Sequence, residues 1–188
     1  MPSADLGASA SVVLPADVER WLADLGLEPV ERADRDGIAS WDLVLDGRRR
    51  FDLRVTVILD PALALICWAH YAPPINDMFR KSYRRLLHWN DEFPFAKFSV
   101  GEDERPLLAV EQSIAHAAAS GADGLGLALV RILGIADRLL DESKAWIWIG
   151  GRMPDPAGRT SRNAALIERF TADIPDLFVE TADGEPEG

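Results

Sequence analysis

Residues 121–134, GADGLGLALVRILG, raise the question of a phosphate-binding loop, because three glycines lie within six positions at the start of an apolar run. A dinucleotide fingerprint needs the order G-x-G-x-x-G directly after a strand, so that backbone amides reach the pyrophosphate at a helix N-terminus. Here the order is G-x-x-G-x-G, residues 115–120 intervene, and no Gly-Lys-Ser/Thr follows as a P-loop requires. We therefore expect no nucleotide site, and we expect Gly126 and Gly134 to permit close packing by the sheet or the first helix.

The other residue types that could do chemistry are scattered along the chain. His70, His88 and His116 are eighteen and twenty-eight residues apart, whereas zinc sites have closely paired ligands on at least one side. Cys67 and His70 are close, but on a strand they would point to opposite faces. A cysteine nucleophile needs a neighbouring base, and the sequence marks none beside Cys67. We predict no catalytic residue, no metal site and no cofactor.

The composition excludes several classes of protein. The chain has 188 residues, of which 48% are hydrophobic, enough for one folded domain with an appendage. A formal charge of -11 argues against nucleic-acid binding, which depends on Lys and Arg neutralising phosphates. No apolar run approaches the roughly 20 residues that span a bilayer, and residues 1–15 lack the basic region of a secretory signal. With a single cysteine, these features predict a cytoplasmic protein that binds no membrane.

Hydrophobic periodicity predicts the elements that would position any site. A run from Pro15 that ends at Gly26 has helical spacing, and Asp46-Gly47 is a hairpin signal between two alternating segments. In chain order we expect a helix over 15–26, strands over 38–46, 50–60 and 62–71, a helix over 75–90, strands over 93–100 and 106–114, and a helix beginning within 121–134. This order, α-β-β-β-α-β-β-α, indicates an α+β fold with an antiparallel sheet of about five strands and helices on one face.

The end of the middle helix carries a recognisable motif. A Leu-x-x-x-Asn segment leads into a strand of the form Phe/Tyr-Ala-Lys-Phe, at Leu86, Asn90, Phe95, Ala96, Lys97 and Phe98. In this motif and in element order the chain resembles the YbjN-domain family, the bacterial sensory-transduction-regulator group, over about residues 15–149. The resemblance implies the fold of type III secretion chaperones, which are usually dimeric, and it carries no established catalytic residues.

The chain thus divides into a flexible N-terminus over 1–14, a YbjN-like domain over 15–149, and an appendage over 150–188. The appendage has a Gly- and Pro-containing linker, a short amphipathic segment and an acidic tail that we expect to be disordered. Segment 163–170 is too short to be helical alone. Its apolar residues Leu166, Ile167 and Phe170 therefore need a surface, and we expect it on the chain itself or a dimer mate, at the apolar run 146–149.

The function that these features favour is a non-enzymatic protein-interaction module, chaperone-like or a regulatory adaptor, acting as a homodimer on a protein partner of unknown identity. The residues expected to serve subunit association, partner binding or packing on the sheet are Ile75, Met78, Phe79, Tyr83, Leu86, Trp146 and Trp148. The basic face of the middle helix is either a solvated face or a docking site for an acidic segment, and its residues are Arg80, Lys81, Arg84 and Arg85.

The alternative is a small-ligand-binding protein or an enzyme whose site is assembled from dispersed residues over the sheet. Asp52, Arg54, His70 and Glu111 are the candidates for such a site. A deep pocket lined by convergent polar groups with shifted pKa values would favour this alternative.

Overall fold

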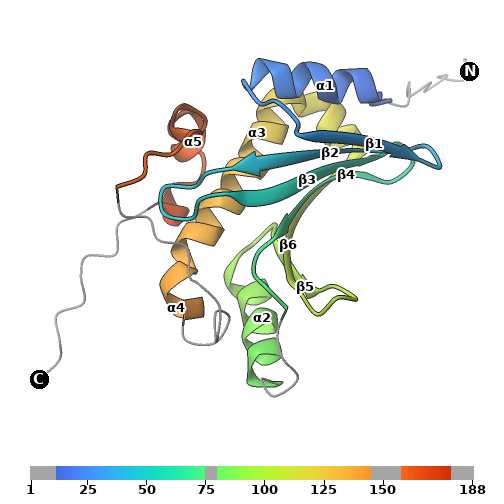
Figure 1. Ribbon diagram of the computed structural model, residues 1–188. Helices are drawn as coiled ribbons and strands as arrows, with labels where there is room; N and C mark the ends of the chain where they lie inside the picture. Colours follow the sequence, from blue (N-terminus) through green and yellow to red (C-terminus); the bar gives the residue numbers. More distant parts are fainter. Residues whose placement is uncertain (1–11, 75–79, 145–157, 179–188) are drawn as a thin grey trace, which may run out of the picture.

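The computed structural model describes residues 12–74, 80–144 and 158–178, and these form an α+β fold in which helices pack on one face of an open antiparallel sheet (Figure 1). The helices are α1 (Pro15–Asp24), α2 (Arg80–Glu92), α3 (Ile114–Arg138), α4 (Leu140–Lys144), α5 (Ala164–Thr171) and the short 3-10 helix η2 (Pro175–Leu177). The strands are β1 (Glu31–Arg35), β2 (Ile38–Leu45), β3 (Leu53–Asp60), β4 (Ala64–His70), β5 (Lys97–Val100) and β6 (Pro106–Ser113). The predicted fold class is confirmed.

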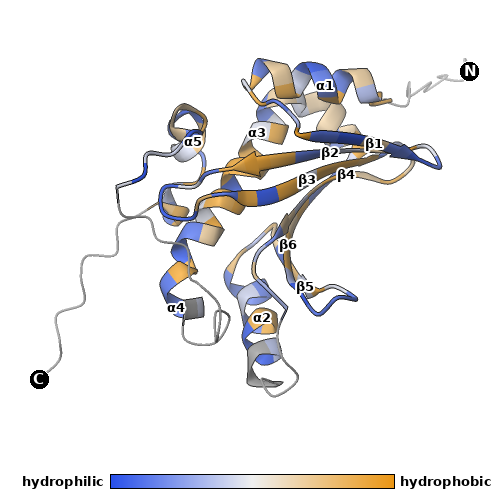
Figure 2. Cartoon of the chain, viewed as in Figure 1, coloured by the Kyte–Doolittle hydropathy of each residue, from blue (hydrophilic) through white to orange (hydrophobic). Residues whose placement is uncertain are grey.

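The six described strands lie in the order β1-β2-β3-β4-β6-β5, one more than the sequence pattern indicated. The additional strand, β1, has the sequence ERADR and is exposed at all five positions, so it has no apolar alternation to reveal it. Asp36 and Gly37 connect it to β2 with positive φ angles of 56° and 79°, as a two-residue hairpin requires. Figure 2 shows β1 as hydrophilic beside the largely hydrophobic β2 and β3.

The two faces of the sheet differ in burial. Along β2, β3 and β4 the buried residues alternate with partly exposed ones, and Trp41, Val57 and Cys67 are buried side by side on the inner face. Helices α2 and α3 pack on this inner face, and α1 packs on α3. In the described ranges no helix covers the opposite face, which we call the outer face.

Helix α3 is the central element of the core, since it contacts β4, β6, α1, α5 and η2. It begins at Ile114, seven residues before the predicted start, because the Ser113 hydroxyl caps it by accepting a hydrogen bond from the His116 N–H at 3.3 Å. Gly121, with φ 56° and ψ -135°, breaks the helix geometry after its first turns. By length and composition α3 could cross a membrane. Its buried side chains pack between the sheet, α1 and α5, which accounts for that composition here.

Helix α2 is anchored by an aromatic cluster. The Trp89 ring lies 5.1 Å from that of Phe98 and 6.1 Å from that of Tyr71, and all three residues are buried. The side-chain amide of Asn90, on the same helix, hydrogen-bonds the backbone of Phe98 in the way that a neighbouring strand would. Its Oδ1 accepts from the Phe98 N–H at 2.5 Å, and its Nδ2 donates to the Phe98 carbonyl at 3.2 Å. These bonds satisfy the outward backbone groups of Phe98 on the edge strand β5.

Candidate functional site

The loop between β2 and β3 is held in place by a carboxylate from α3. Residues 46–52 connect the two antiparallel strands, so the hairpin that Asp46-Gly47 signalled is present, but its loop is longer than the residues 47–49 that the predicted strands left between them. The Asp137 side chain accepts hydrogen bonds from the backbone N–H groups of residues 48–50 at 2.6, 2.9 and 2.6 Å. A Cβ atom at Gly47 would lie 2.5 Å from Asp137 Oδ1, so the chain needs glycine there.

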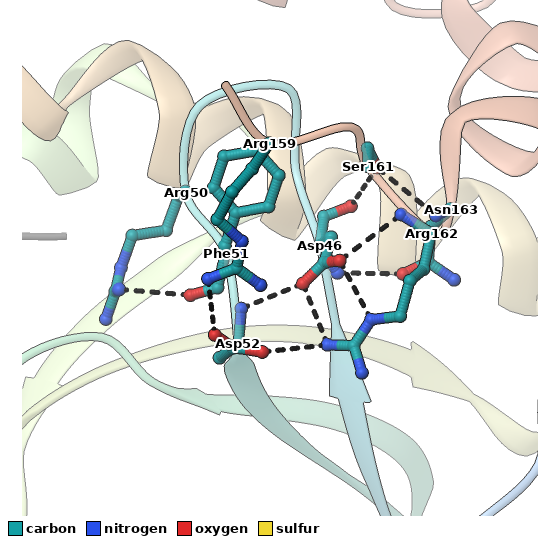
Figure 3. Close-up of polar contacts among 8 residues, drawn as sticks. All are labelled: Asp46, Arg50, Phe51, Asp52, Arg159, Ser161, Arg162 and Asn163. Carbon is teal, nitrogen blue, oxygen red and sulfur yellow. Dashed lines mark hydrogen bonds and ion pairs between the residues drawn. The ribbon is translucent and has the colours of Figure 1, made fainter. Parts of the chain in front are cut away.

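The second carboxylate of this loop binds the C-terminal part of the chain (Figure 3). Asp46, whose side chain is 1% exposed, accepts from the Arg162 guanidinium at 2.8 and 2.9 Å and from the Arg162 N–H at 3.2 Å. Its own N–H donates to Asn163 Oδ1 at 2.7 Å, and its carbonyl accepts from the Ser161 hydroxyl at 2.9 Å. Every polar group of Asp46 therefore contacts the segment before α5.

Two further contacts extend this arrangement. Asp52 forms ion pairs with Arg159 at 2.7 Å and with Arg162 at 3.0 Å, and the Arg159 guanidinium lies 4.4 Å from the centre of the Phe51 ring. The partners are more than a hundred residues apart in the sequence. We call these residues, 46, 51, 52, 159 and 161–163, the C-terminal clamp.

The clamp shifts the acidity of its carboxylates. Burial would raise the pKa of Asp46, but hydrogen bonds from Arg162 and from the Asp52 N–H outweigh burial and lower this pKa to about 2. The pKa of Asp52 is lowered, chiefly by its hydrogen bond with Arg159. Burial raises the pKa of Asp137, and the three N–H groups that it binds oppose that effect. The clamp is therefore an ion-pair network whose charged form is favoured at neutral pH.

Beyond the clamp, α5 and η2 lie against α3 at two glycines. The position of a Cβ at Gly126 would be 2.5 Å from Phe170 Cε2 and 2.9 Å from Leu25 Cδ2. At Gly134 it would be 2.9 Å from Phe178 Cζ. We call this side of α3 the glycine groove. The prediction that these glycines permit close packing is confirmed. The nearest side chains come from the C-terminal segment and from Leu25, the residue that follows α1, and not from the sheet, which the prediction also named.

The amphipathic segment of the appendage packs on its own chain, which is one of the two surfaces, its own domain or a dimer mate, that the sequence left open. Leu166, Ile167 and Phe170 are 7%, 1% and 5% exposed, and α5 contacts α3. The surface beneath Phe170 is formed by Gly126 and Leu25. The apolar run 146–149, which the sequence suggested as that surface, lies outside the described residues.

The outer face of the sheet has an apolar centre and a charged border. Ile58 and Ile66 are direct partners across β3 and β4, and Trp68 lies one position further along the same face of β4. All three are partly exposed. The charged residues around them on this face are Asp42, Arg54, Asp60, Lys97 and Glu111. Such an arrangement is typical of protein-binding surfaces.

Several residues of the predicted association surface lie outside the described part of the chain, namely Ile75, Met78, Phe79, Trp146 and Trp148. Leu86 is 2% exposed and Tyr83 is partly buried, and both pack within the core of their own chain. These two side chains hold α2 on the sheet. The use of the whole set for association stays a prediction.

The basic face of α2 is described only in part. Arg84 and Arg85 are exposed, and Arg85 forms an ion pair with Glu142 of α4. Helix α2 begins at Arg80 and includes Lys81, whose side chains the structure does not describe. Docking of an acidic segment on this face stays a prediction.

The candidates for a dispersed ligand or catalytic site do not gather at one place. Asp52 belongs to the C-terminal clamp, and Glu111 forms an ion pair with Lys97 at 3.6 Å near the far edge of the outer face. Arg54 and His70 each lie one residue beyond the paired Val55 and Ala69, on the outer face. A cavity of about 260 Å³ lies elsewhere, between α1 and the first turns of α3, with Trp21 in its wall.

The metal-binding residue types are also separated in the described residues, where no group of three His, Cys, Asp or Glu side chains lies close enough to hold a metal ion. Cys67 is buried on the inner face and His70 is partly exposed on the outer face, as the strand period predicted. Burial raises the pKa of the Cys67 thiol to about 12. The thiol is therefore protonated at neutral pH, which makes it unreactive.

The site residues that the sequence missed are Asp137 and those of the clamp other than Asp52, which was a candidate for a different kind of site. Their contacts join positions 46–52 to positions 137 and 159–163, and no local spacing signals such long-range pairing. The sequence features that could have pointed to the clamp were the Asp46-Gly47 pair and the arginines that precede α5.

Comparison with known proteins gave a match to a family model but none to a curated protein. The family model YbjN, described as "Putative bacterial sensory transduction regulator", matches residues 14–144. A search of curated proteins gave no match. The matched range includes the sheet, the outer face, the loop 46–52 and the glycine groove, and it ends before the segment that fills the groove.

Proposed function

Because the chain belongs to the YbjN family, we propose that it is a non-enzymatic regulatory module that acts by binding another protein through the outer face of its sheet. The observation that carries this proposal is the outer face itself. Its apolar centre at Ile58, Ile66 and Trp68 is partly exposed, and no described helix covers it. Aromatic and aliphatic residues within a polar border are typical of the energetic centre of an interface.

The chemistry of the described residues supports binding rather than catalysis. The thiol of Cys67 is buried and protonated at neutral pH. Three carboxylates form extensive hydrogen-bond networks, namely Asp46, Asp52 and Asp137. Their partners are backbone amides or arginines of the same chain. These carboxylates are engaged in holding loops together and do not converge on a pocket.

The first partner to consider is a second copy of the chain. Arg54 and Asp60 lie at opposite ends of β3 on the outer face, with Thr56 and Ile58 between them. A two-fold axis that is perpendicular to β3 and parallel to the sheet would bring the two outer faces together. It would place Arg54 of each copy opposite Asp60 of the other, with the two apolar centres in contact. Charge complementarity of this kind fixes register in an isologous interface.

Multi-angle light scattering of the purified chain at micromolar concentration tests the proposal. We expect about twice the chain mass of 20.7 kDa. The substitution Ile66→Glu should give a folded monomer, because it places an unpaired charge at the centre of the interface. The control Leu87→Glu changes a side chain that is 65% exposed on α2 and should leave the dimer intact.

A monomeric wild-type chain, or a dimer that Ile66→Glu does not weaken, would refute the second copy as the occupant of this face. Circular dichroism of each variant separates a lost interface from a lost fold. The pair Arg54→Glu and Asp60→Arg gives a sharper test of the two-fold register. Each single reversal should weaken the dimer, and the double reversal should restore it.

A further inference from the structure

We propose that the glycine groove of α3 is a helix-binding site distinct from the outer face, and that residues 158–178 occupy it as a resident ligand. The partner that fits the groove is a short amphipathic helix with the residue pattern Arg-Asn-x-x-Leu-Ile-x-x-Phe, as found in this chain at 162–170. Such a helix in another protein replaces the resident segment when it binds more tightly.

The groove is shaped to receive aromatic rings. Glycine inside a helix is less favourable than alanine, yet α3 has glycine at both positions where rings of the C-terminal segment approach it. At Gly126 and Gly134 a methyl group would lie within 3 Å of Phe170 and Phe178. The backbone of α3 is thus the floor of the groove, and two rings lie directly upon it.

A polar site at the end of the groove fixes the direction of the bound helix. Asp46 binds the arginine before the helix through two guanidinium nitrogens, and its backbone N–H is bound by Asn163. Arg162 is 54% exposed and Asp46 only 1%. The Asp46 carboxylate also accepts from the Asp52 N–H of its own loop at 2.9 Å, so the domain holds it in place, and the arginine reaches it from the C-terminal segment. A two-nitrogen contact of this kind is specific for arginine.

The receptor and its ligand are separate in the sequence. Leu25, Asp46, Gly126 and Gly134 all lie within residues 14–144, the range that the family model matches. The ligand residues 158–178 all lie outside that range. Helix α5 has eight residues and cannot be stable alone, so the segment is helical because the groove binds it. The family domain supplies a binding site, and this chain also supplies the occupant.

Covalent connection determines how strongly a partner must bind. A segment joined by a short linker acts at an effective concentration on the order of millimolar. A partner helix with identical contacts could not compete at micromolar concentration. A competing partner therefore needs additional contacts, for example by continuing beyond the position of Phe178.

The experiment uses the full chain with a site-specific protease sequence introduced at 152–156, cut after purification. The probe is a fluorescent peptide of residues 158–178. We expect saturable binding to the cut chain and binding about ten-fold weaker or more to the uncut chain, whose resident segment competes. Peptides with Phe170→Ala or Arg162→Ala should each bind about ten-fold more weakly or worse. The control peptide Glu168→Ala changes an exposed residue and should bind as the unmodified peptide does.

Three outcomes would overturn the proposal. If the cut chain unfolds and binds no peptide, the segment is a permanent part of the core. If Phe170→Ala does not weaken the peptide, the groove is not the binding site. If the intact chain forms dimers that Phe170→Ala abolishes, the occupant is the segment of a second copy. The Ile66→Glu variant should bind the peptide normally, so failure of the proposed outer-face interface would leave this result unchanged.

Discussion

Replacing Gly126 by alanine should destabilise the protein although alanine is the better helix former. The substitution gains about 1 kcal/mol in helix propensity. The new methyl group would lie 2.5 and 2.6 Å from two ring carbons of Phe170 and 2.9 Å from Leu25 Cδ2, well inside van der Waals contact. Overpacking of this kind costs about 1–3 kcal/mol, and these distances favour the upper end. We expect a net loss of about 1–2 kcal/mol, or a melting temperature lower by about 2–8 °C.

The same substitution should have the opposite effect when the ring is absent. Phe170→Ala alone should cost about 3–5 kcal/mol, as for other buried phenylalanines. In that background the two ring contacts no longer exist, and Leu25 can move its terminal methyl group. Gly126→Ala should then raise the free energy of unfolding by up to about 1 kcal/mol. Urea denaturation of the four proteins measures this coupling. If Gly126→Ala stabilises the chain with Phe170 present, the close packing at this glycine is refuted.

Three further predictions concern the loop and the glycine-rich stretch. Asp137→Asn should lower the free energy of unfolding by about 2–3 kcal/mol in urea, because an amide NH₂ would replace one of the two oxygens and face at least one of the three backbone N–H groups, such as that of Arg48. Since the pKa of Asp46 is lowered from 3.8 to about 2, its contribution is present above pH 3.8 and is lost as the pH falls through about 2. Its size is about 1–2 kcal/mol, given the half-exposed Arg162, and Arg162→Gln should flatten this part of the stability profile. ATP, GTP and NAD should leave the melting temperature unchanged, whereas a nucleotide bound at a hundred times its Kd would add about 2.7 kcal/mol; a clear shift would restore the phosphate-loop reading of residues 121–134.

The strands could be predicted from the sequence where one face of the strand is buried and the other is exposed. Leu43 and Val55 belong to strands in which apolar and polar residues alternate, and both are buried on the inner face. Strand β1 escaped because a strand exposed on both faces has no alternation to detect. Its turn at Asp36-Gly37 was a usable signal, since it is the same residue pair as the hairpin signal at Asp46-Gly47.

That second pair shows why the site was harder to predict than the fold. Locally, Asp46-Gly47 favours a tight turn, but the loop is shaped by two remote groups. Asp137 binds its amides from α3, and Arg162 binds the Asp46 carboxylate from 116 residues away. Long-range polar contacts leave no periodicity in a single sequence. The apolar side of α5 does, and for that reason the sequence predicted that this side packs on a surface, either of the chain itself or of a dimer mate.

The way in which Asn90 covers the edge of β5 also determines which assemblies the chain can form. An open sheet edge adds further strands one after another, and such head-to-tail growth has no natural end. Here the amide of Asn90 takes both outward backbone groups of Phe98, and at the opposite edge four of the five residues of β1 are charged. Fibril-like growth is therefore discouraged at both edges. Association through a sheet face about a two-fold axis stops at two copies, so the chain can keep an apolar face exposed without starting a polymer.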